Sequence, residues 1–252
     1  MYRTFCISLL WLLPSALAHA ENGKIALAFP ASGIAIDGDL SDWPQTAAVQ
    51  ANDFARGQLP TGPEDLAATL RLGYDADANA LYVGVEVDDD ETVLTDAEDA
   101  RRRDSCALYL SAADTAGRQQ LYIATDDAEL ARGWRERIID AAHVQFAVGR
   151  EGHQYRYEWR IALAGVGAGA LVARPGAVLA FNVSIQDVDT ADEPPFTLLS
   201  WGDFSRGRRG TAGLGDVLLV AQTSQLGRVH GRLEWSHAEG EEPPRKLLLR
   251  QG

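Results

Sequence analysis

The sequence predicts an all-β fold, namely an antiparallel β-sandwich of the jelly-roll type with about nine to ten short strands. Apolar residues recur at every second position in many short segments, and turn-forming residues separate these segments. Only residues 96–103 offer a short helical alternative. Because alternation gives each strand one apolar face, two stacked layers can bury these faces against each other. The 252 residues, with 46% hydrophobic content, suit one domain of ordinary size.

Residues 1–20 have the pattern of a cleaved export signal. Arg3 supplies the positive start, residues 5–13 are largely apolar, and Ala18-His19-Ala20 places small residues where a signal peptidase cuts. A membrane-spanning helix needs about 20 apolar residues, and this apolar stretch is shorter. No cysteine follows it as a point of lipid attachment. We therefore expect a periplasmic or extracellular mature chain, and the alternative is an uncleaved N-terminal anchor.

The predicted strands follow one another through most of the remaining chain. The clearest hairpin joins residues 70–74 to residues 81–87 through a turn of Asp, Ala and Asn residues. Trp159 alternates in phase with Tyr157 and Ile161, so we expect its ring in the core. The full set of predicted strands is 25–29, 70–74, 81–87, 106–110, 121–124, 144–148, 155–161, 179–185 and 217–220.

Residues 21–221 form the predicted sandwich domain, and residues 222–252 differ from it in character. This second segment carries two adjacent prolines, an acidic patch at residues 239–242 and a basic end. It offers one further short strand at residues 229–235. We predict that it is a short C-terminal tail.

Composition excludes several classes of partner and cofactor. The 23 Lys and Arg residues against 36 Asp and Glu give a net charge of −13, which argues against nucleic-acid binding. Without residues 1–20 the chain keeps Cys106 as its only cysteine and no methionine, so it can form no internal disulfide and no methionine-ligated haem or copper site. It contains no dinucleotide fingerprint and no phosphate loop, so we expect no nucleotide. No second apolar run approaches the length of a membrane span.

The sequence contains no motif that identifies an enzyme. Neither a nucleophile elbow nor a zinc-protease motif is present, and Cys106 lies within an apolar strand. A glycosidase needs only two suitably placed carboxylates, and 36 acidic residues leave that class open. We expect a non-catalytic protein, with a glycoside-hydrolase-associated role as the alternative.

Six stretches in order resemble family 9 carbohydrate-binding modules and their relatives. The first is Ile36-Asp37-Gly38-Asp39-Leu40-Ser41-Asp42-Trp43-Pro44, and the others are 67–74 with 81–87, 104–110, 155–161, 175–189, and Trp201 with 215–219. The resemblance covers roughly residues 25–221. It implies a β-sandwich, sugar binding in a cleft between aromatic rings, and often bound calcium. From the residues themselves we expect a tight turn at Asp37-Gly38, with Trp43 packing over one end of the sandwich rather than touching sugar.

The chain departs from the family's ligand platform. That platform usually has the pattern Trp-x-x-Asp-x-x-Glu, and here the three places are held by Arg101, Asp104 and Ala107. Sugar binding uses a flat apolar face and charged acceptors for hydroxyl groups. The aromatic residue and the second carboxylate of this pattern are missing, so the usual sugar-binding site is altered or lost.

Four residues are the candidates for ligand contacts: Trp201, Trp134, Asp104 and Arg101. Trp201 matches the family's second aromatic residue and is the first candidate for a stacking ring, with packing over the sheet end as the alternative. Trp134 lies in a polar loop, where exposure is expected. The arginines at 101–103 and at 206, 208 and 209 could bind the carboxylate of an acidic sugar, or they could pair with the chain's own acids.

Acidic residues at two strand ends are candidate calcium ligands. Asp88 and Asp90 end one strand, and Asp187 and Asp189 end another. Ca²⁺ takes six to eight oxygen ligands, which such carboxylates and backbone carbonyls can supply. A solvated acidic edge that discourages strand-to-strand aggregation explains the same residues.

The sequence therefore predicts an exported, non-catalytic carbohydrate-binding domain that takes a glycan or oligosaccharide. The alternative is a periplasmic structural or protein-interaction domain with a degenerate sugar site. We expect neither nucleic acid nor membrane as a partner, and the sequence does not indicate the oligomeric state.

Overall fold

The computed structural model describes residues 24–44, 48–93, 103–112, 120–124, 141–166, 171–189, 196–203 and 213–221. The predicted export signal, the tail at 222–252 and nearly all of the helical alternative at 96–103 lie outside these residues. Among the residues described, no helix has the length and apolar content to cross a membrane.

Twelve strands make up almost all the regular structure of the described residues. The strands are β1 (Ile25–Pro30), β2 (Val49–Gln50), β3 (Asp53–Gly57), β4 (Leu66–Asp75), β5 (Ala80–Asp89), β6 (Ser105–Ala112), β7 (Gln120–Ala124), β8 (Val144–Glu151), β9 (Gln154–Ala162), β10 (Val178–Asp187), β11 (Thr197–Ser200) and β12 (Gly215–Leu219). Three short 3₁₀ turns, η1 (Leu40–Asp42), η3 (Ala141–His143) and η4 (Leu163–Gly165), join some of them.

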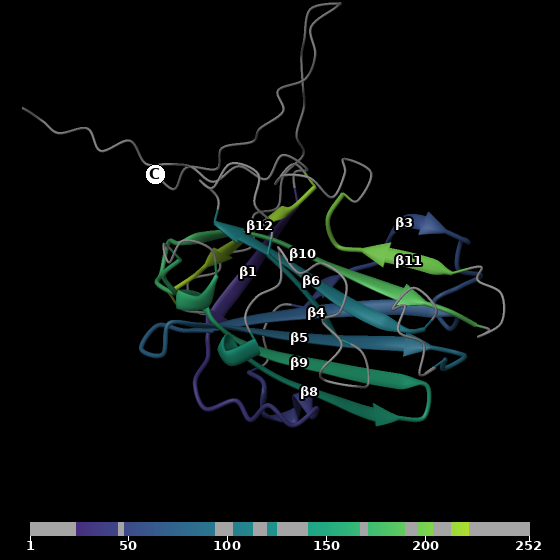
Figure 1. The fold of residues 1–252 in the computed structure, drawn as a ribbon, viewed down its shortest axis with the longest axis horizontal. Helices are drawn as coiled ribbons and strands as arrows, with labels where there is room; N and C mark the ends of the chain where they lie inside the picture. Colours follow the sequence, from purple (N-terminus) through teal and green to yellow (C-terminus); the bar gives the residue numbers. More distant parts are fainter. Residues whose placement is uncertain are drawn as a thin grey trace, which may run out of the picture.

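The strands form two layers that β1 connects. The order from edge to edge is β3-β11-β10-β12-β1-β4-β5-β9-β8, with β2 on β4 and the β6–β7 pair on β10. In Figure 1, β1 runs between β12 and β4, and β4, β5, β9 and β8 lie side by side. The two pairings of β1 are parallel and all the others are antiparallel. The predicted β-sandwich is confirmed, with β1 as the departure from a purely antiparallel arrangement.

One core lies between the layers, and alternation places its residues there. Val83 and Val85 of β5 and Trp159 of β9 come from one layer, and Phe181 and Val183 of β10 come from the other. Trp159 is fully buried, as its phase in the sequence predicted.

All nine predicted strands are present, and the sequence analysis missed β2, β3 and β11. β2 has only two residues, and β11 is buried along its whole length, so its residues Thr-Leu-Leu-Ser show no alternation. β3 lies at the edge of the sheet and is mostly exposed. Such strands lack the half-buried pattern on which period-two analysis depends.

Candidate functional site

Strands from both layers bring aspartate side chains together at one end of the core. β5 ends with Asp89, β10 ends with Asp187, and Asp104 immediately precedes β6. Asp89 and Asp187 continue the inward-facing rows of their strands, because each comes two residues after a core residue, Val87 in β5 and Ile185 in β10. Gln186 pairs with Ser105, and Leu66 pairs with Asp89. These pairings place Asp104, which precedes Ser105, and Asp65, which precedes Leu66, at the same end of the core.

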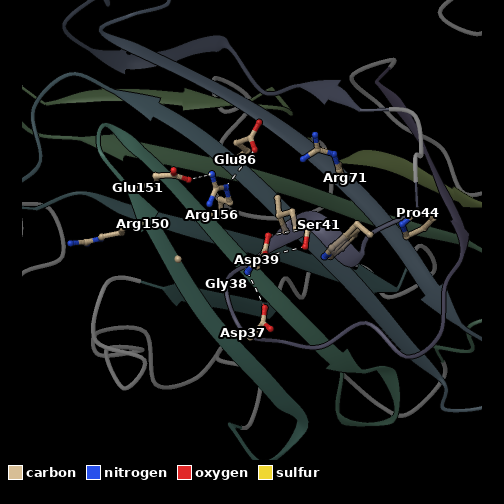
Figure 2. A pocket seen from close by; sticks show the side chains of 13 residues that line it. Asp37, Gly38, Asp39, Ser41, Pro44, Arg71, Glu86, Arg150, Glu151 and Arg156 are labelled. Carbon is tan, nitrogen blue, oxygen red and sulfur yellow. Dashed lines mark hydrogen bonds and ion pairs between the residues drawn. The ribbon is translucent and has the colours of Figure 1, made fainter.

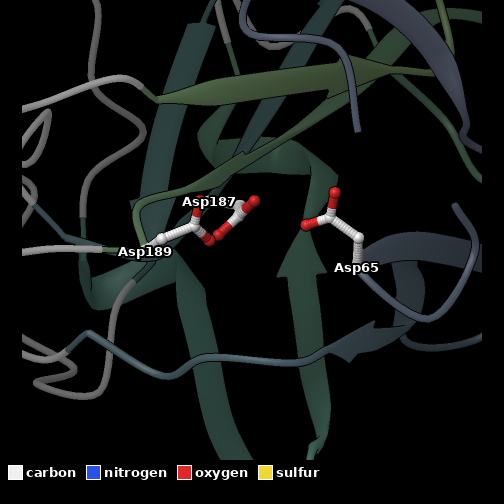
Figure 3. A group of neighbouring side chains, drawn as sticks. All are labelled: Asp65, Asp187 and Asp189. Atoms are coloured by element: carbon white, nitrogen blue, oxygen red, sulfur yellow. The ribbon is translucent and has the colours of Figure 1, made fainter. Parts of the chain in front are cut away.

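The cluster consists of two overlapping groups. Asp89, Asp104 and Asp187 form one group, and Asp65, Asp187 and Asp189 form the other, which Figure 3 shows. Within each group, one carboxylate oxygen of every residue lies within 4.8 Å of the others. Asp187 is common to both. We call these five residues the aspartate cluster.

The structure brings two of the four predicted metal ligands together with other carboxylates. Asp187 and Asp189 belong to the aspartate cluster, whereas Asp88 and Asp90 are not members of it. Asp88 points outward and accepts a hydrogen bond from Gln154 Nε2 at 3.1 Å. The alternation of β5 decides this, since Asp89 shares its phase with Val85 and Val87 and faces inward. That phase is visible in the sequence, and it places Asp89, which the sequence analysis did not select, in the aspartate cluster.

Both carboxylate oxygens of Asp104 accept hydrogen bonds from backbone N–H groups. Its Oδ2 accepts from Val93 N at 2.6 Å, and its Oδ1 accepts from Val188 N at 2.9 Å. The Tyr155 hydroxyl donates to Oδ2 at 3.4 Å. One carboxylate thus joins the segments that follow β5 and β10, which makes Asp104 a structural anchor of the cluster.

Asp187 lacks such partners. Only 2% of its surface is exposed, and its Oδ1 is buried without a hydrogen bond. Leaving a buried acceptor unsatisfied costs about 1–3 kcal/mol, and more when the group is charged. Asp187 is therefore the residue in the cluster with the strongest need for a positive ligand or a proton.

Burial and mutual repulsion raise the pKa values of the cluster. Burial, followed by the charge of Asp104, raises the pKa of Asp89 to about 8. Burial, followed by the charges of Asp89 and Asp189, raises the pKa of Asp187 to about 8. For Asp104, burial raises the pKa to about 6, and the hydrogen bonds from Val93 and Val188 oppose the rise. A cation among these carboxylates would remove the repulsion that keeps them protonated.

The donor set of the aspartate cluster suits a hard divalent cation. All its ligands are oxygens, and it contains neither the nitrogen nor the sulfur ligands that zinc and copper favour. The unpaired Oδ1 of Asp187 adds a buried acceptor that protein groups leave open. These residues therefore fit Ca²⁺.

A second feature, a groove, lies on the outer face of the layer formed by β4, β5, β9 and β8. It is lined by residues 37–41, 43 and 44, by Arg71, Glu86 and Arg156, and by residues 149–151. We call it the outer groove; its volume is about 540 Å³. Figure 2 shows Arg156 between Glu86 and Glu151, with Arg71 apart from them.

Glu158 fixes one wall of the outer groove. This residue faces outward from β9 yet is fully buried, because the segment Asp37–Pro44 covers it. Its Oε1 accepts from Trp43 Nε1 at 2.6 Å, and its Oε2 accepts from the backbone N–H groups of Asp37 and Gly38. A positive φ of 86° at Gly38 permits this turn, as the sequence predicted.

Trp43 is buried, but its position differs from the predicted one. It packs on the outer face of β5 with Tyr82 and Ile34, rather than over an end of the sandwich. Gly84 makes room for it, because a Cβ there would lie 3.1 Å from Trp43 Cζ2. The sequence analysis did not foresee Glu158, whose outward phase in β9 predicted a solvated residue.

Comparison with known proteins identifies the family. The model of the carbohydrate family 9 binding domain-like family matches residues 36–222. The chain belongs to this family. A search of functionally curated proteins gave no significant match.

Solved structures of carbohydrate family 9 modules have the same fold. Two from Caldicellulosiruptor kristjanssonii, one in complex with glucose and one with cellotriose, match with TM-scores of 0.63 and 0.61 at 18% and 17% identity. The matches cover 81% and 82% of this chain and 100% of each module. A proposed carbohydrate-binding protein from Bacteroides uniformis matches with a TM-score of 0.51 at 10% identity, over 78% of this chain and 99% of that one. At these identities the similarity concerns the fold.

Two residues of the resemblance to family 9 modules, Trp201 and Ala107, lie among the described residues and are buried. Trp201, the first candidate for a stacking ring, is only 2% exposed and lies 6.1 Å from the Phe181 ring in the core. The structure therefore places the Trp201 ring inside the core rather than on a surface that a ligand could stack against. Ala107, at the carboxylate place, packs in a small apolar cluster with Tyr109, Ala180 and Leu214.

The remaining predicted ligand contacts divide into two sets. Asp104 is buried and anchors the aspartate cluster, so its side chain is not available to a sugar hydroxyl. Arg101 and Trp134 lie outside the described residues, as do Arg206, Arg208 and Arg209.

Without divalent cations, we expect the melting temperature to fall as pH rises from 5 to 9. In the folded chain Asp89 and Asp187 keep their protons up to about pH 8, whereas in the unfolded chain they lose them near pH 4. Stability from these raised pKa values is complete below about pH 4 and is lost as pH passes through the folded values. Thermal unfolding followed by circular dichroism in EDTA measures this slope.

The control for this experiment is Asp88→Asn, which should keep the slope because Asp88 is exposed. Asp187→Asn should flatten it. A melting temperature in EDTA that stays constant from pH 5 to 9 would contradict the electrostatic account of the aspartate cluster.

Replacing Glu158 by Gln should lower the free energy of unfolding by about 1–3 kcal/mol. Glutamine keeps one acceptor oxygen but turns an NH₂ group toward the N–H donors of Trp43, Asp37 and Gly38. Urea denaturation measures the loss. The matched control is Glu64→Gln, since Glu64 is exposed; equal stabilities of the two variants would show that Glu158 does not hold the segment.

Proposed function

We propose that this chain is an exported, non-catalytic carbohydrate-binding protein. The observation that carries the proposal is the family match over residues 36–222 on a β-sandwich. Relatives of the same fold are described in complex with glucose and with cellotriose, which supports a saccharide as the ligand class. The export signal predicted at residues 1–20 supports a location in the periplasm or outside the cell. The lack of an enzyme motif in the sequence supports a binding role.

The proposal includes a structural Ca²⁺ ion in the aspartate cluster. Asp187, which belongs to both groups, would be a ligand together with Asp89 and Asp104 or with Asp65 and Asp189. When bound, the ion supplies a positive charge that neutralises the carboxylates. Because these residues follow β5, precede β6 and follow β10, the ion would fix three strand ends of the two layers relative to one another. Its expected effect is on stability.

A second candidate function is a structural or protein-interaction domain. The burial of Trp201 and the apolar surroundings of Ala107 favour it, because they remove two contacts that a family platform would use. This candidate predicts a stable fold that binds no saccharide.

Titration with short saccharides distinguishes the two functions. We expect the full chain to bind at least one of cellotriose, xylotriose, mannotriose and trigalacturonate, with a dissociation constant between about 1 μM and 1 mM. Isothermal titration calorimetry, repeated with Ca²⁺ and with EDTA below the melting temperature of each form, measures it. Heats equal to those of dilution for all four saccharides would favour the interaction domain and reject sugar binding.

A further inference from the structure

The outer groove contains an arginine with no protein partner. Arg71 projects from the outer face of β4, where it is partly buried and lines the groove. Among the described residues no hydrogen bond or ion pair involves its side chain. Arg156, by contrast, contacts Glu151 at 3.0 Å, Gln154 at 2.7 Å and Glu86 at 3.8 Å. Arg71 therefore offers five N–H donors to a ligand.

The walls of the outer groove are fixed before any ligand arrives. Glu158 holds the Asp37–Gly38 backbone, and the Asp39 side chain accepts from both the backbone and the hydroxyl of Ser41. Opposite them, the backbone at Gly149 approaches Gly38 so closely that a Cβ on Gly149 would lie 2.0 Å from the Gly38 carbonyl oxygen. Binding to such a surface costs little ordering of the protein.

The lining has the mixed polarity that a polyhydroxylated ligand requires. Its charged members are mixed: the guanidinium groups of Arg71 and Arg156 lie among the carboxylates of Asp37, Asp39, Glu86 and Glu151, whereas the Arg150 guanidinium lies 5.0 Å from the centre of the Tyr155 ring. Each sugar hydroxyl both donates and accepts, so guanidinium and carboxylate groups in one groove can serve several hydroxyls. Leu40 and Pro44 add apolar surface for the C–H groups of a sugar ring. A volume of about 540 Å³ lies within the range of small-molecule sites, about 300–1,000 Å³.

Charge balance also selects the kind of saccharide. With four carboxylates against the two guanidinium groups of Arg71 and Arg156, the groove provides no net attraction for an acidic sugar. The whole chain carries a net charge of −13, which repels polyanions at long range. A neutral saccharide is repelled neither by the carboxylates of the groove nor by the net charge of the chain.

We propose that the outer groove binds a neutral saccharide and that Arg71 is its principal hydrogen-bond donor. This inference rests on the proposed carbohydrate-binding function and places the ligand on the β4–β5–β9 face. It does not use the platform at Arg101, Asp104 and Ala107. Ala107 is buried among apolar neighbours at that platform, whereas the charged side chains of the outer groove line an open volume of about 540 Å³.

The test compares Arg71→Gln with Arg160→Gln in the full chain. Arg160 faces outward on β9 of the same layer but does not line the groove, so its variant is the matched control. Cellotriose, xylotriose and mannotriose serve as neutral probes, and trigalacturonate serves as the acidic probe. Chemical-shift changes in ¹H–¹⁵N spectra give both affinity and location. Melting temperatures confirm that each variant is folded.

We expect a neutral probe to shift the amide signals of Gly38 and Gly149, and Arg71→Gln to weaken its binding about tenfold or more. Arg160→Gln should leave the affinity unchanged. Saccharide binding with unchanged affinity in Arg71→Gln would overturn the assignment of the ligand to the outer groove but not the proposed carbohydrate-binding function. Binding of trigalacturonate alone would overturn the neutral class. No binding of any of the four probes to the unchanged protein would overturn both the groove and the proposed function.

Discussion

Five carboxylates gathered at one end of the sandwich constrain the rest of the structure. Two layers close over a core only if the residues at its ends are either polar and solvated or satisfied within the protein. Here Asp89, Asp104 and Asp187 extend the inward rows of three strands and are almost completely buried. Backbone N–H groups satisfy Asp104, but an oxygen of Asp187 stays unpaired. This end of the fold therefore needs protons or, as we propose, a Ca²⁺ ion.

The two outer faces of the sandwich differ in the side chains that they carry. On the β6–β10 face, where the family platform would lie, Ala107 packs among apolar neighbours and Trp201 has turned into the core. On the opposite face, buried Glu158 holds the Asp37–Pro44 segment, which then forms a wall of the outer groove. The fold common to family 9 modules is thus retained, and among the described residues the outer groove brings charged and apolar side chains together on the β4–β5–β9 face.

The sequence predicted the fold well because alternation is a local signal, and all nine predicted strands are present. The site was harder to predict because it depends on phase and on long-range contact. Asp89 rather than Asp88 faces inward, and counting from Val85 and Val87 would have shown this. Asp65 joins the cluster through pairing with β5, which no local pattern indicates. Glu158 lies on the outward side of β9, and only the covering segment 120 residues earlier in the chain buries it.

Titration of individual aspartates tests the central constraint most directly. Carboxyl ¹³C shifts of Asp89 and Asp187 can be followed from pH 3 to pH 9 in the intact chain, once in EDTA and once with Ca²⁺. The account predicts midpoints near 8 for both residues in EDTA and ionised carboxylates across pH 5–9 with Ca²⁺. Midpoints near 4 in EDTA, or a titration that Ca²⁺ does not change, would contradict it.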